Sequence, residues 1–495
     1  MNGQINEEMI AGCEQEDLRH SGAILGDGAL LHVGAADQRI THVSENIARF
    51  AARTPEQLLG RPFAESGIPI ALDPADIAMS PGSRTLLGDE TAGAAGQWRY
   101  VVTVVKTGWL VEIVPAPAAR EGDAAARYQR IEIDTLAKES EIAQFAGRLA
   151  AAVRDIAGFD RVMVYRFEDD WSGTVIAEES APGIGSYMGL RFPASDIPKI
   201  ARDLYMSTPY RYIPDSAALA VKVVSTSGEP LDLTHADLRS VSPLHLEYLR
   251  NMGVASSFSI PIMVQGGLWG LLACHALRPG RLGQASIRQM RRLVNEYAVG
   301  LANFTVSRRM TAISTIQRTL DEIGAGIAAP SDLPAALARR GTDLAALIQC
   351  EAGAVALNDA TWVYGAPAPD REVVEQIDAW FANECPEAMF STDNLSGVMA
   401  AAARFTAQVS GVYALKVQAA RFYWFRPELV QQVDWAGNPD KAVVGTSGRL
   451  ELSPRKSFEK WLHVKHGYSD SWRNEHRMAA KKIGSVLQTW PSLRP

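Results

Sequence analysis

The residues of this chain that are best suited to chemistry lie between positions 191 and 275. The run Arg191-Phe192-Pro193-Ala194-Ser195-Asp196-Ile197-Pro198 places an aspartate between two prolines, whose rings restrict the backbone on either side. His245 and Tyr248 are three residues apart, which puts both on one face of a helix. Arg211 and Arg239 lie between these two runs. Such groups hold a ligand by hydrogen bonds and charge, although a histidine satisfied in the core and solvated arginines would fit the same pattern.

Motifs for catalysis are absent from the sequence. It contains no phosphate-binding loop, no GxGxxG after a strand, no HExxH and no GxSxG. The three glycines between Gly183 and Gly189 lack the spacing of a nucleotide-binding fingerprint, which favours an ordinary loop. No ATP lid or phosphoacceptor region of a histidine kinase follows the last segment. We therefore expect no enzymatic activity from this chain, with any kinase or other output activity lying outside it.

The four cysteines are far apart in the sequence, at Cys13, Cys274, Cys350 and Cys385. No two of them have CxxC spacing, so neither a zinc site nor a disulfide framework is indicated. Cys13 lies in a polar N-terminal segment, where packing offers little to a cysteine. Its position is the unusual one of the four.

Length and composition indicate a multidomain globular protein. At 495 residues, the chain suggests roughly three domains of about 150 residues each. Its 49 Lys and Arg against 56 Asp and Glu give a formal charge of −7, which provides no basic patch for nucleic acid or an anionic membrane. The polar start argues against a signal peptide, and no apolar run of about 18 residues could span a bilayer. We expect a soluble, cytoplasmic protein.

The first two segments both mix short strands and helices. Up to about residue 115, the sequence predicts strands over 29–33 and 98–105 and short helices over 44–52 and 54–59, the second capped by Thr54. The next segment is expected to contain a helix over 131–156 and strands over 161–167, 256–264 and 268–275. Met163, Tyr165 and Phe167 share one strand face, and Ser257 and Ser259 share one face of a later strand. A sheet with one solvated face would also fit this pattern.

A helical pattern of unusual length follows. Apolar residues recur at spacings of three and four through roughly 35 residues. They are Ile287, Met290, Val294, Tyr297, Leu301, Phe304, Met310, Ile313, Ile316, Leu320 and Ile323. A core helix, and a helix that joins two domains and packs against a partner's copy, are both consistent with the pattern.

The third segment, from about residue 330, again mixes helices and strands. Residues 344–350 and 354–357 are typical of a core. Residues 433–460 have turn signals, few apolar residues and many charges, which indicates a protruding arm or a long loop.

Three separated motifs resemble the phytochrome family, in the expected order along the chain. The run from Pro193 to Pro198, the run from Ser242 to Gly253 and Cys274-His275 resemble its bilin-binding GAF domain. Pro454-Arg455-Lys456-Ser457-Phe458 resembles the PRxSF motif of its PHY domain. Leu244 stands where plant-type members carry a cysteine. Cys13-Glu14 instead resembles the attachment site of bacteriophytochromes, which bind biliverdin.

The resemblance covers essentially the whole chain and implies its architecture. The implied fold is α+β, with three tandem mixed α/β domains, antiparallel sheets, a long connecting helix and a protruding arm. The expected domains are PAS over residues 1–120 with the attachment segment, GAF over 121–309 and PHY over 310–495, with the arm at about 433–465. The expected partners are a second copy bound through the long helix and an output domain or signalling protein, with no nucleic acid, membrane or metal.

The resemblance also implies a ligand, biliverdin IXα, linked to Cys13 through a thioether to its ring-A vinyl group. Such a conjugated tetrapyrrole with two propionates needs aromatic side chains and a few convergent cations and hydroxyls. By resemblance, Arg211 and Arg239 bind the ring-B propionate, and Ser257 and Ser259 the ring-C propionate. The residues expected near ring D and the pyrrole nitrogens are Met163, Tyr165, Phe192, Asp196, Ile197, Pro198, Tyr205, His245, Tyr248 and His275.

The implied function is red/far-red light sensing. Isomerisation of the C15=C16 double bond would turn ring D, and the protein would respond as a two-state switch. By resemblance, Arg455 on the arm pairs with Asp196 in the red-absorbing state, and Ser457 replaces it after photoconversion. The arm would change between strand-like and helical form, and the long helix would carry the change to a partner.

Some residues depart from the family pattern, and another function remains open. Gly26-Asp27 stands where the family usually has Pro-His. Ala276 follows Cys274-His275 where the family often has a second histidine. Trp435-Ala436-Gly437 stands where Trp-Gly-Gly is common. The alternative is a PAS/GAF signalling module that binds another small ligand, such as a cyclic nucleotide.

Overall fold

The computed structural model describes residues 17–93, 96–115, 136–327, 329–358, 360–437, 458–490 and 493. The chain divides into two compact units, residues 1–302 with 435–461 and residues 303–434 with 462–495. Each unit has its own core of buried apolar residues. Within the described ranges, no helix is long and apolar enough to cross a membrane.

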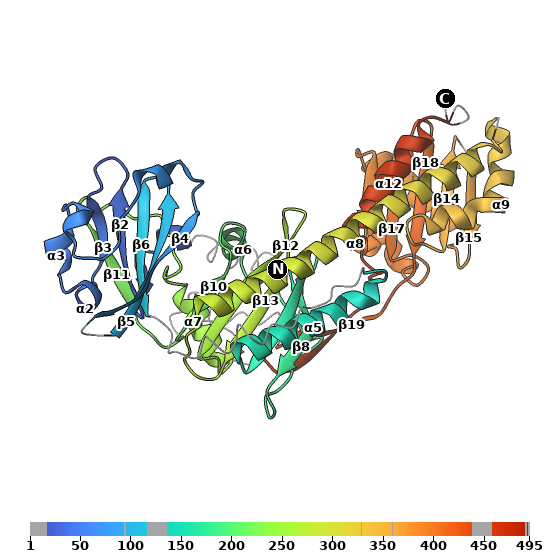
Figure 1. Cartoon of the computed structure of the whole chain (residues 1–495). Helices are drawn as coiled ribbons and strands as arrows, with labels where there is room; N and C mark the ends of the chain where they lie inside the picture. Colours follow the sequence, from blue (N-terminus) through green and yellow to red (C-terminus); the bar gives the residue numbers. More distant parts are fainter. Residues whose placement is uncertain are drawn as a thin grey trace. The chain divides into compact units, whose positions relative to one another are not determined.

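The first sheet of unit one is antiparallel and has the strand order β1-β11-β3-β2-β6-β5-β4. Its strands are β1 (Ala23–Leu25), β2 (Ala29–Gly34), β3 (Ile40–Ser44), β4 (Arg84–Gly93), β5 (Gly96–Val105), β6 (Gly108–Pro115) and β11 (Ala220–Ser225). Short helices lie around it: η1 (Leu18–His20), α2 (Ala48–Ala51), α3 (Pro55–Leu58), η2 (Phe63–Glu65) and η3 (Pro74–Ala78). Although β11 falls in the stretch expected for the second domain, it pairs with β1 and β3 and appears as a green strand among blue ones in Figure 1.

Both faces of this first sheet are buried, because successive side chains of a strand point to opposite sides. Leu31 and Val111 belong to a core shared with the short helices. Leu30 and Leu110, their neighbours in sequence, pack on the opposite face against Leu238. A segment from the stretch expected for the second domain therefore covers one face of the first sheet.

The two predicted helices of this region have different outcomes. The helix over 54–59 is confirmed as α3, with Thr54 as its N-cap and the Thr54 N–H donating to Gln57 Oε1 at 2.9 Å. The helix predicted over 44–52 is shorter in the structure, where α2 covers only Ala48–Ala51. Ser44 is the last residue of β3, and its Oγ accepts a hydrogen bond from Leu30 N at 3.0 Å, so the chain is still extended there.

The second sheet has the strand order β10-β12-β13-β7-β8-β9-β19-β20. Its strands are β7 (Arg161–Phe167), β8 (Gly173–Ser180), β9 (Arg191–Phe192), β10 (Arg211–Ile213), β12 (Ser256–Val264), β13 (Gly267–Ala276), β19 (Gln431–Ala436) and β20 (Lys460–Lys465). The predicted strands over 161–167 and 256–264 are confirmed residue for residue. The pairings are antiparallel from β10 to β9, whereas β9 and β19 pair in parallel.

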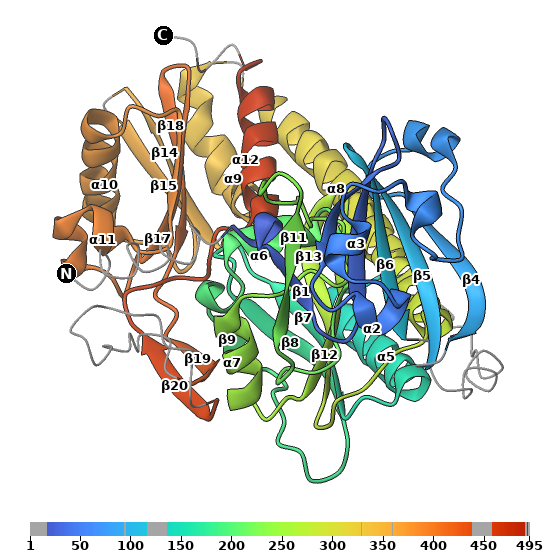
Figure 2. The ribbon, with the colours of Figure 1, turned by 90° about the vertical axis from the view of Figure 1, so that its left-hand side faces the viewer.

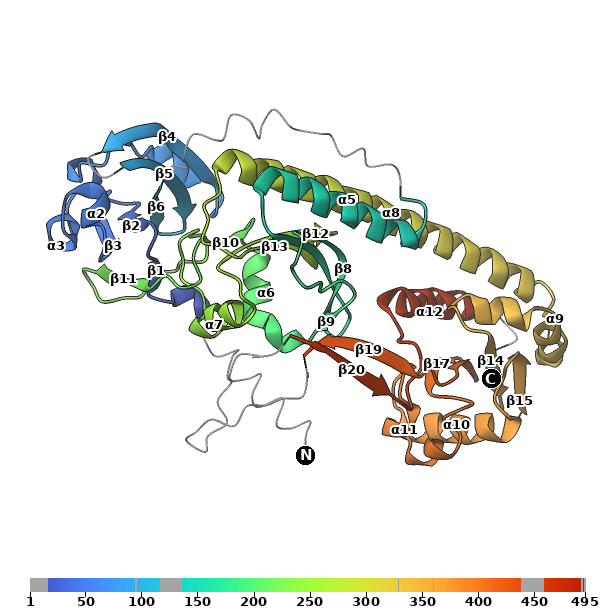
Figure 3. The same ribbon diagram turned by 90° about the horizontal axis from the view of Figure 1, so that it is seen from below.

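Several helices pack around this sheet. They are α5 (Glu139–Ala157), η4 (Ala194–Asp196), α6 (Lys199–Tyr205), α7 (Pro243–Asn251) and the first part of α8 (Gln284–Gly324). Figure 3 shows α5 beside α8, where Tyr297 Oη donates to Ile142 O at 3.3 Å. Of the helix predicted over 131–156, residues 131–135 lie outside the described residues, and α5 starts at Glu139. The extended Lys138 is its N-cap, and Glu141 Oε2 accepts hydrogen bonds from Ala137 N and Lys138 N.

The long helix α8 contributes to both units. Met290 and Val294 near its start and Leu320 near its end are fully buried. Between them, Met310 is 65% exposed and Ile313 is 37% exposed. The predicted apolar stripe is therefore covered towards its two ends and is open to solvent in the middle.

Unit two is built on an antiparallel sheet with the order β15-β14-β18-β17-β16. Its strands are β14 (Ala352–Leu357), β15 (Ala360–Gly365), β16 (Met389–Thr392), β17 (Gly411–Val417) and β18 (Ala420–Arg426). Its helices are η5 (Pro330–Asp332), α9 (Leu333–Ala346), α10 (Arg371–Glu384), α11 (Leu395–Val398), η6 (Ala400–Arg404) and α12 (Asn474–Leu487). Figure 2 shows α9 and α12 on one side of this sheet and α10 and α11 on the other.

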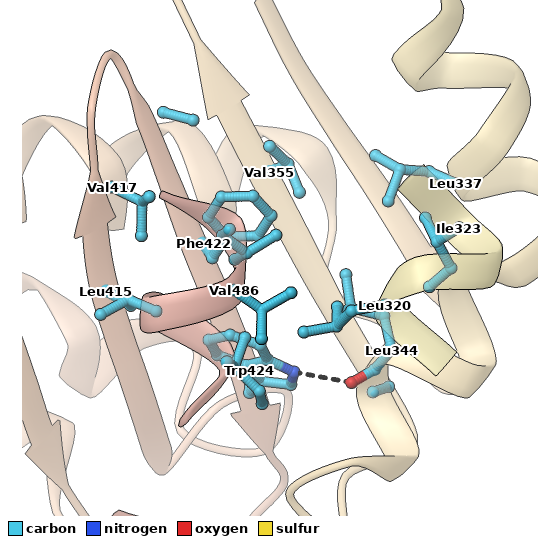
Figure 4. Packing of buried hydrophobic residues seen from close by; sticks show 14 of the residues in the cluster. Leu320, Ile323, Leu337, Leu344, Val355, Leu415, Val417, Phe422, Trp424 and Val486 are labelled. Carbon is cyan, nitrogen blue, oxygen red and sulfur yellow. Dashed lines mark hydrogen bonds between the residues drawn. The ribbon is translucent and has the colours of Figure 1, made fainter. Parts of the chain in front are cut away.

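The larger core of unit two lies between this sheet, α9, α12 and the end of α8. Leu320, Val355 and Phe422 meet there, and Trp424 Nε1 donates to Leu344 O at 3.1 Å (Figure 4). The core-like character predicted for residues 344–350 and 354–357 is confirmed, because Leu344 and Val355 are buried.

Replacement of Leu320 by alanine tests whether the end of α8 is part of this core. Leu320 is fully buried, so we expect Leu320→Ala to lower the free energy of unfolding of unit two by about 2–5 kcal/mol. Arg318→Ala, at an exposed position of the same helix two residues before Leu320, should change it by less than about 0.5 kcal/mol. Differential scanning calorimetry of the whole chain measures both. Equal effects of the two substitutions would contradict this assignment.

Candidate functional site

Aromatic and apolar side chains gather on one face of the second sheet. Met163 and Tyr165 of β7 and Phe192 of β9 are 5%, 7% and 6% exposed, and Ile197 and Tyr205 pack against them. The Tyr165 and Phe192 rings have their centroids 6.1 Å apart. The alternation along β7 places Met163 and Tyr165 on this face, as predicted.

Gly173 determines where the Tyr165 ring lies. A Cβ atom added to Gly173 would be 1.9 Å from Tyr165 Cζ, well below any contact that real Cβ atoms make. The hydroxyl oxygen of Tyr165 is buried and has no hydrogen-bond partner among the described residues. Because Gly173 on β8 has no side chain, the Tyr165 ring can lie against this strand.

The segment from Pro193 to Pro198 forms a short turn before a helix. Asp196 ends η4, and Pro198 is the N-cap of α6. Tyr248 Oη on α7 donates to Asp196 Oδ2 at 3.0 Å, and Arg202 Nη1 donates to Ile197 O at 2.6 Å. The two family-like runs, which are far apart in the sequence, thus meet at Asp196 and Tyr248.

Two buried arginines lie next to the serines of β12. Arg211 pairs with Ser259 in the strand register, and Ile213 pairs with Ser257. Arg211 is 9% exposed and donates from Nη1 to Asp237 O at 3.0 Å and from Nη2 to Arg239 O. Tyr205 Oη and Ser259 Oγ are 2.7 Å apart.

Neither arginine has its full set of partners in the described part of the chain. Arg239 is 4% exposed and donates from Nη1 to Leu18 O at 3.3 Å. The Nε atoms of Arg211 and Arg239 are buried without a hydrogen-bond acceptor among the described residues. Burial lowers the pKa of Arg211 to about 10 and that of Arg239 to about 9, and each arginine lacks a nearby carboxylate strong enough to offset this.

Both histidines of the site are neutral at neutral pH. Desolvation lowers the pKa of His245 to about 4 and that of His275 to about 3. The His245 and Tyr248 rings are stacked with centroids 6.1 Å apart. His275 lies on β13 opposite Ser257, and its Nδ1 is buried with no partner in the described ranges.

The base of the arm contacts this site. Trp435 pairs with Arg191, whose guanidinium carbon is 5.5 Å from the Trp435 ring centroid. The Phe458 and Tyr248 rings make an edge-to-face contact with centroids 5.0 Å apart. The arm predicted from residues 433–460 is described only at its two ends, and the proposed switch residues Arg455 and Ser457 lie outside the described residues.

The three departures from the family pattern have distinct surroundings. A Cβ on Gly26 would be 2.8 Å from Leu219 O, so this position requires a close backbone approach. Burial raises the pKa of Asp27, and its Oδ1 has no partner in the part of the chain that the structure describes. Ala276 pairs with Ser256 at the end of β13, and Ala436 is fully buried.

The cysteines separate into two groups. Cys274, Cys350 and Cys385 are buried free thiols. Cys13 lies outside the described residues. The chain just after it is described from Asp17, and Leu18 O accepts a hydrogen bond from Arg239, so this part of the N-terminal segment contacts the arginines.

Sequence reasoning missed several residues of this site. Tyr187 packs edge-to-face on Phe192 with centroids 5.8 Å apart, and Met252 and Phe458 join the same apolar cluster. Phe458 closes the PRxSF-like motif, so its type was visible although its contact was not. Tyr187 lies in the loop with three glycines, where no local pattern marks it.

The arrangement fits an elongated anionic, conjugated ligand. It combines an aromatic surface with two cations and two hydroxyl groups. It leaves the Nε atoms of Arg211 and Arg239 and the Nδ1 atom of His275 buried without partners in the described chain. Buried polar groups without partners are costly, and a ligand with carboxylate and carbonyl oxygens would satisfy them. Among the described residues, no group of three or more His, Cys, Asp or Glu could hold a metal ion.

Comparisons with known proteins agree with this geometry. The family models "Phytochrome region" and "GAF domain" match residues 316–490 and 141–301. Cyanobacterial phytochrome B of Nostoc sp. is 31% identical over 97% of this chain and 66% of its own length. A bacteriophytochrome of Pseudomonas aeruginosa is 31% identical over 96% of this chain and 66% of its own length. The solved photosensory core module of the Stigmatella aurantiaca phytochrome is 30% identical to this chain, with a TM-score of 0.76. The match covers 96% of this chain and 97% of the Stigmatella chain.

The chain therefore belongs to the phytochrome family and corresponds to its photosensory core. It is a red/far-red light photoreceptor module, and family membership implies a bilin chromophore. The alternative of a module for cyclic nucleotides is not favoured. The chain spans about two thirds of the length of the two full relatives named above.

The contact between Gly173 and Tyr165 can be tested by a double-mutant cycle. Gly173→Ala should lower the free energy of unfolding by about 1–3 kcal/mol, because the added methyl group overlaps the ring. In a Tyr165→Ala background the same change should cost at least about 1 kcal/mol less. The control is Gly185→Ala, where an added Cβ meets no atom within 4 Å. Chemical denaturation measures all four variants, and additive effects would contradict the contact.

Proposed function

We propose that the chromophore is biliverdin IXα and that Cys13 binds it covalently. The thiol would add across the ring-A vinyl group, so that an Sγ–C bond forms while the thiol proton passes to the other vinyl carbon, and no oxidant is needed. The hydrogen bond from Arg239 to Leu18 O supports this attachment, because it holds the chain five residues after Cys13 beside the buried arginines.

The single observation that carries the proposal is the pair of buried guanidinium groups with unpartnered Nε atoms. We assign Arg211 and Arg239 to the ring-B propionate, since guanidinium donors and a carboxylate form strong charge-assisted hydrogen bonds. Ser257 and Ser259 are assigned to the ring-C propionate. They are next-but-one neighbours on β12, so both project from the same face of that strand.

Other residues would hold the opposite end. Met163, Tyr165, Phe192, Tyr205 and Tyr248 are assigned to the surroundings of ring D, supported by their apolar and ring contacts. His275 would donate to the ring-D carbonyl, because its pKa of about 3 keeps the ring neutral and its Nδ1 is buried without a described partner.

The backbone of the turn before α6 would face the pyrrole nitrogens. Asp196 O and a water held by His245 would accept hydrogen bonds there, and Ile197 and Pro198 would fix the turn. When bound, the bilin supplies light absorption and isomerisation of its C15=C16 double bond. The protein orients it, satisfies its polar groups and excludes water.

We assign the switch to Asp196, Arg455 and Ser457. Arg455 would pair with Asp196 before photoconversion and Ser457 would replace it afterwards. The contacts of Tyr248 support a link of this kind, because its hydroxyl binds Asp196 and its ring packs on Phe458, the residue after Ser457. Movement at Asp196 would then reach the base of the arm directly.

The output lies beyond the photosensory core in this proposal. The chain would form a homodimer through α8, whose middle part exposes apolar side chains: Val299, Val306, Met310 and Ile313. An output domain or a signalling partner would receive the change, and any kinase activity would belong to it. The match to only two thirds of the full relatives supports this division.

Replacement of Cys13 tests the covalent bond. Cys13→Ala should abolish zinc-induced bilin fluorescence on a denaturing gel, because no thioether remains. Cys385→Ala, which removes a buried thiol in the other unit, should keep it. Fluorescence that persists in Cys13→Ala would refute the attachment site.

Replacement of Asp196 tests the switch. Asp196→Ala should keep biliverdin attached but reduce the extent of red-induced conversion, because the arm loses its anionic partner. Asp203→Ala is the matched control, since Asp203 lies on the following helix in an exposed ion pair with Lys199. Absorption spectra before and after red light provide the measurement. A normal red/far-red cycle in Asp196→Ala would overturn the assignment.

A further inference from the structure

Glu112 is a fully buried carboxylate in a contact that is otherwise largely apolar. It lies on β6 between Leu110 and Val114, on the sheet face that packs against Leu238. Burial and the nearby Asp237 carboxylate raise the pKa of Glu112, because both disfavour its charged form. An apolar side chain would fit the face at lower cost, so the bonds that Glu112 makes must account for it.

Those bonds go to the backbone of the second domain. Glu112 Oε1 accepts from Leu238 N at 2.7 Å, and Oε2 accepts from Asp237 N at 3.2 Å. These two amides belong to a turn and not to a strand, so no neighbouring strand supplies their acceptors. One side chain of the first sheet thus fixes two successive peptide groups of the turn.

The carbonyl side of the same turn holds the site arginines. Asp237 O and Arg239 O accept from the two terminal nitrogens of Arg211. Arg239 directly follows Leu238, whose amide is bound by Glu112. The position of both guanidinium groups therefore depends on this turn. Leu25 N of β1 donates to Leu238 O at 2.7 Å, and Glu112 binds the two amides before Arg239.

A second contact from the first sheet holds the side chains of the turn. Arg84 of β4 forms an ion pair with Asp237, and Arg84 Nη2 donates to His235 O at 3.0 Å. Tyr210 Oη donates to Asp237 Oδ2 at 2.5 Å. Arg84 thus fixes the start of the turn, whereas Glu112 binds the backbone next to Arg239.

We propose that Glu112 is a positioning residue for recognition of the ligand's carboxylates, acting through the turn from Asp237 to Arg239 on Arg211 and Arg239. The inference rests on the proposed binding of a bilin. It adds that the N-terminal domain, which contributes neither arginine, sets the selectivity of the site for an anionic ligand.

The test compares biliverdin with its dimethyl ester, which has the same conjugated body but no propionate charges. The parent is the whole chain with Cys13→Ala, so that binding is reversible and absorbance titration gives a Kd for each compound. The parent should prefer the free acid by roughly tenfold or more. In Glu112→Gln, the preference should fall to about threefold or less, because the amide nitrogen cannot accept a backbone N–H and the turn shifts.

Leu30→Ala is the matched structural control. Leu30 is fully buried, pairs with Glu112 in the register of β2 and β6 and packs on the same sheet face, so its loss weakens the domain contact without removing the two hydrogen bonds. Its preference for the free acid should stay at the parent value. If Glu112→Gln does not fold, Glu112→Asp should show the same reduced preference, because the shorter side chain cannot reach both amides.

The outcomes separate the two levels of the proposal. An unchanged preference in the Glu112 variant, or an equal reduction in Leu30→Ala, would overturn the positioning role while leaving bilin binding intact. A parent that binds neither compound would instead contradict the proposed function, and the positioning role with it.

Discussion

The burial of two guanidinium groups is the constraint on which the rest of this structure depends. Arg211 and Arg239 are buried. A cation in the protein interior is costly unless an anion pairs with it. Backbone carbonyls satisfy part of each group, and the Nε atoms are left without described acceptors. The site thus holds two buried positive charges next to an aromatic surface, and a bound anion would stabilise them. In the proposed function, a tetrapyrrole with two propionates would supply this negative charge.

The same constraint explains how the two domains of unit one are joined. The turn from Asp237 to Arg239 must be rigid to hold the arginines. Strand β1 binds part of its backbone, because Arg239 forms a bridge with Ile24 and Leu25 N donates to Leu238 O at 2.7 Å. Two side chains of the first sheet, Glu112 and Arg84, hold the same turn, and β11, which lies in the stretch matched by the GAF model, pairs into that sheet. At the other end of the site, Tyr248 links Asp196 to Phe458 at the base of the arm. In the proposed function, these contacts would connect ligand binding to the base of the arm.

Sequence patterns within a few residues predicted some strands of this structure, but they could not predict contacts between residues far apart in the sequence. Strands 161–167 and 256–264 were found because alternation and β-branched or aromatic residues act within a few positions. The role of Glu112 could not be predicted, because an acid in a strand normally indicates a solvent-facing position and its partners lie over 100 residues away. The pairing of β11 with β3 is equally long-range. For α8, apolar spacing alone could not show that Met310 is exposed.

The most direct test of the account is an absorption spectrum of the whole chain, prepared from a host that makes biliverdin, before and after red light. We predict a coloured protein that converts reversibly between a red-absorbing and a far-red-absorbing form under red and far-red light. A colourless protein, or a coloured one whose spectrum does not respond to light, would contradict the claim that the buried arginines and aromatic residues form a photoactive bilin site.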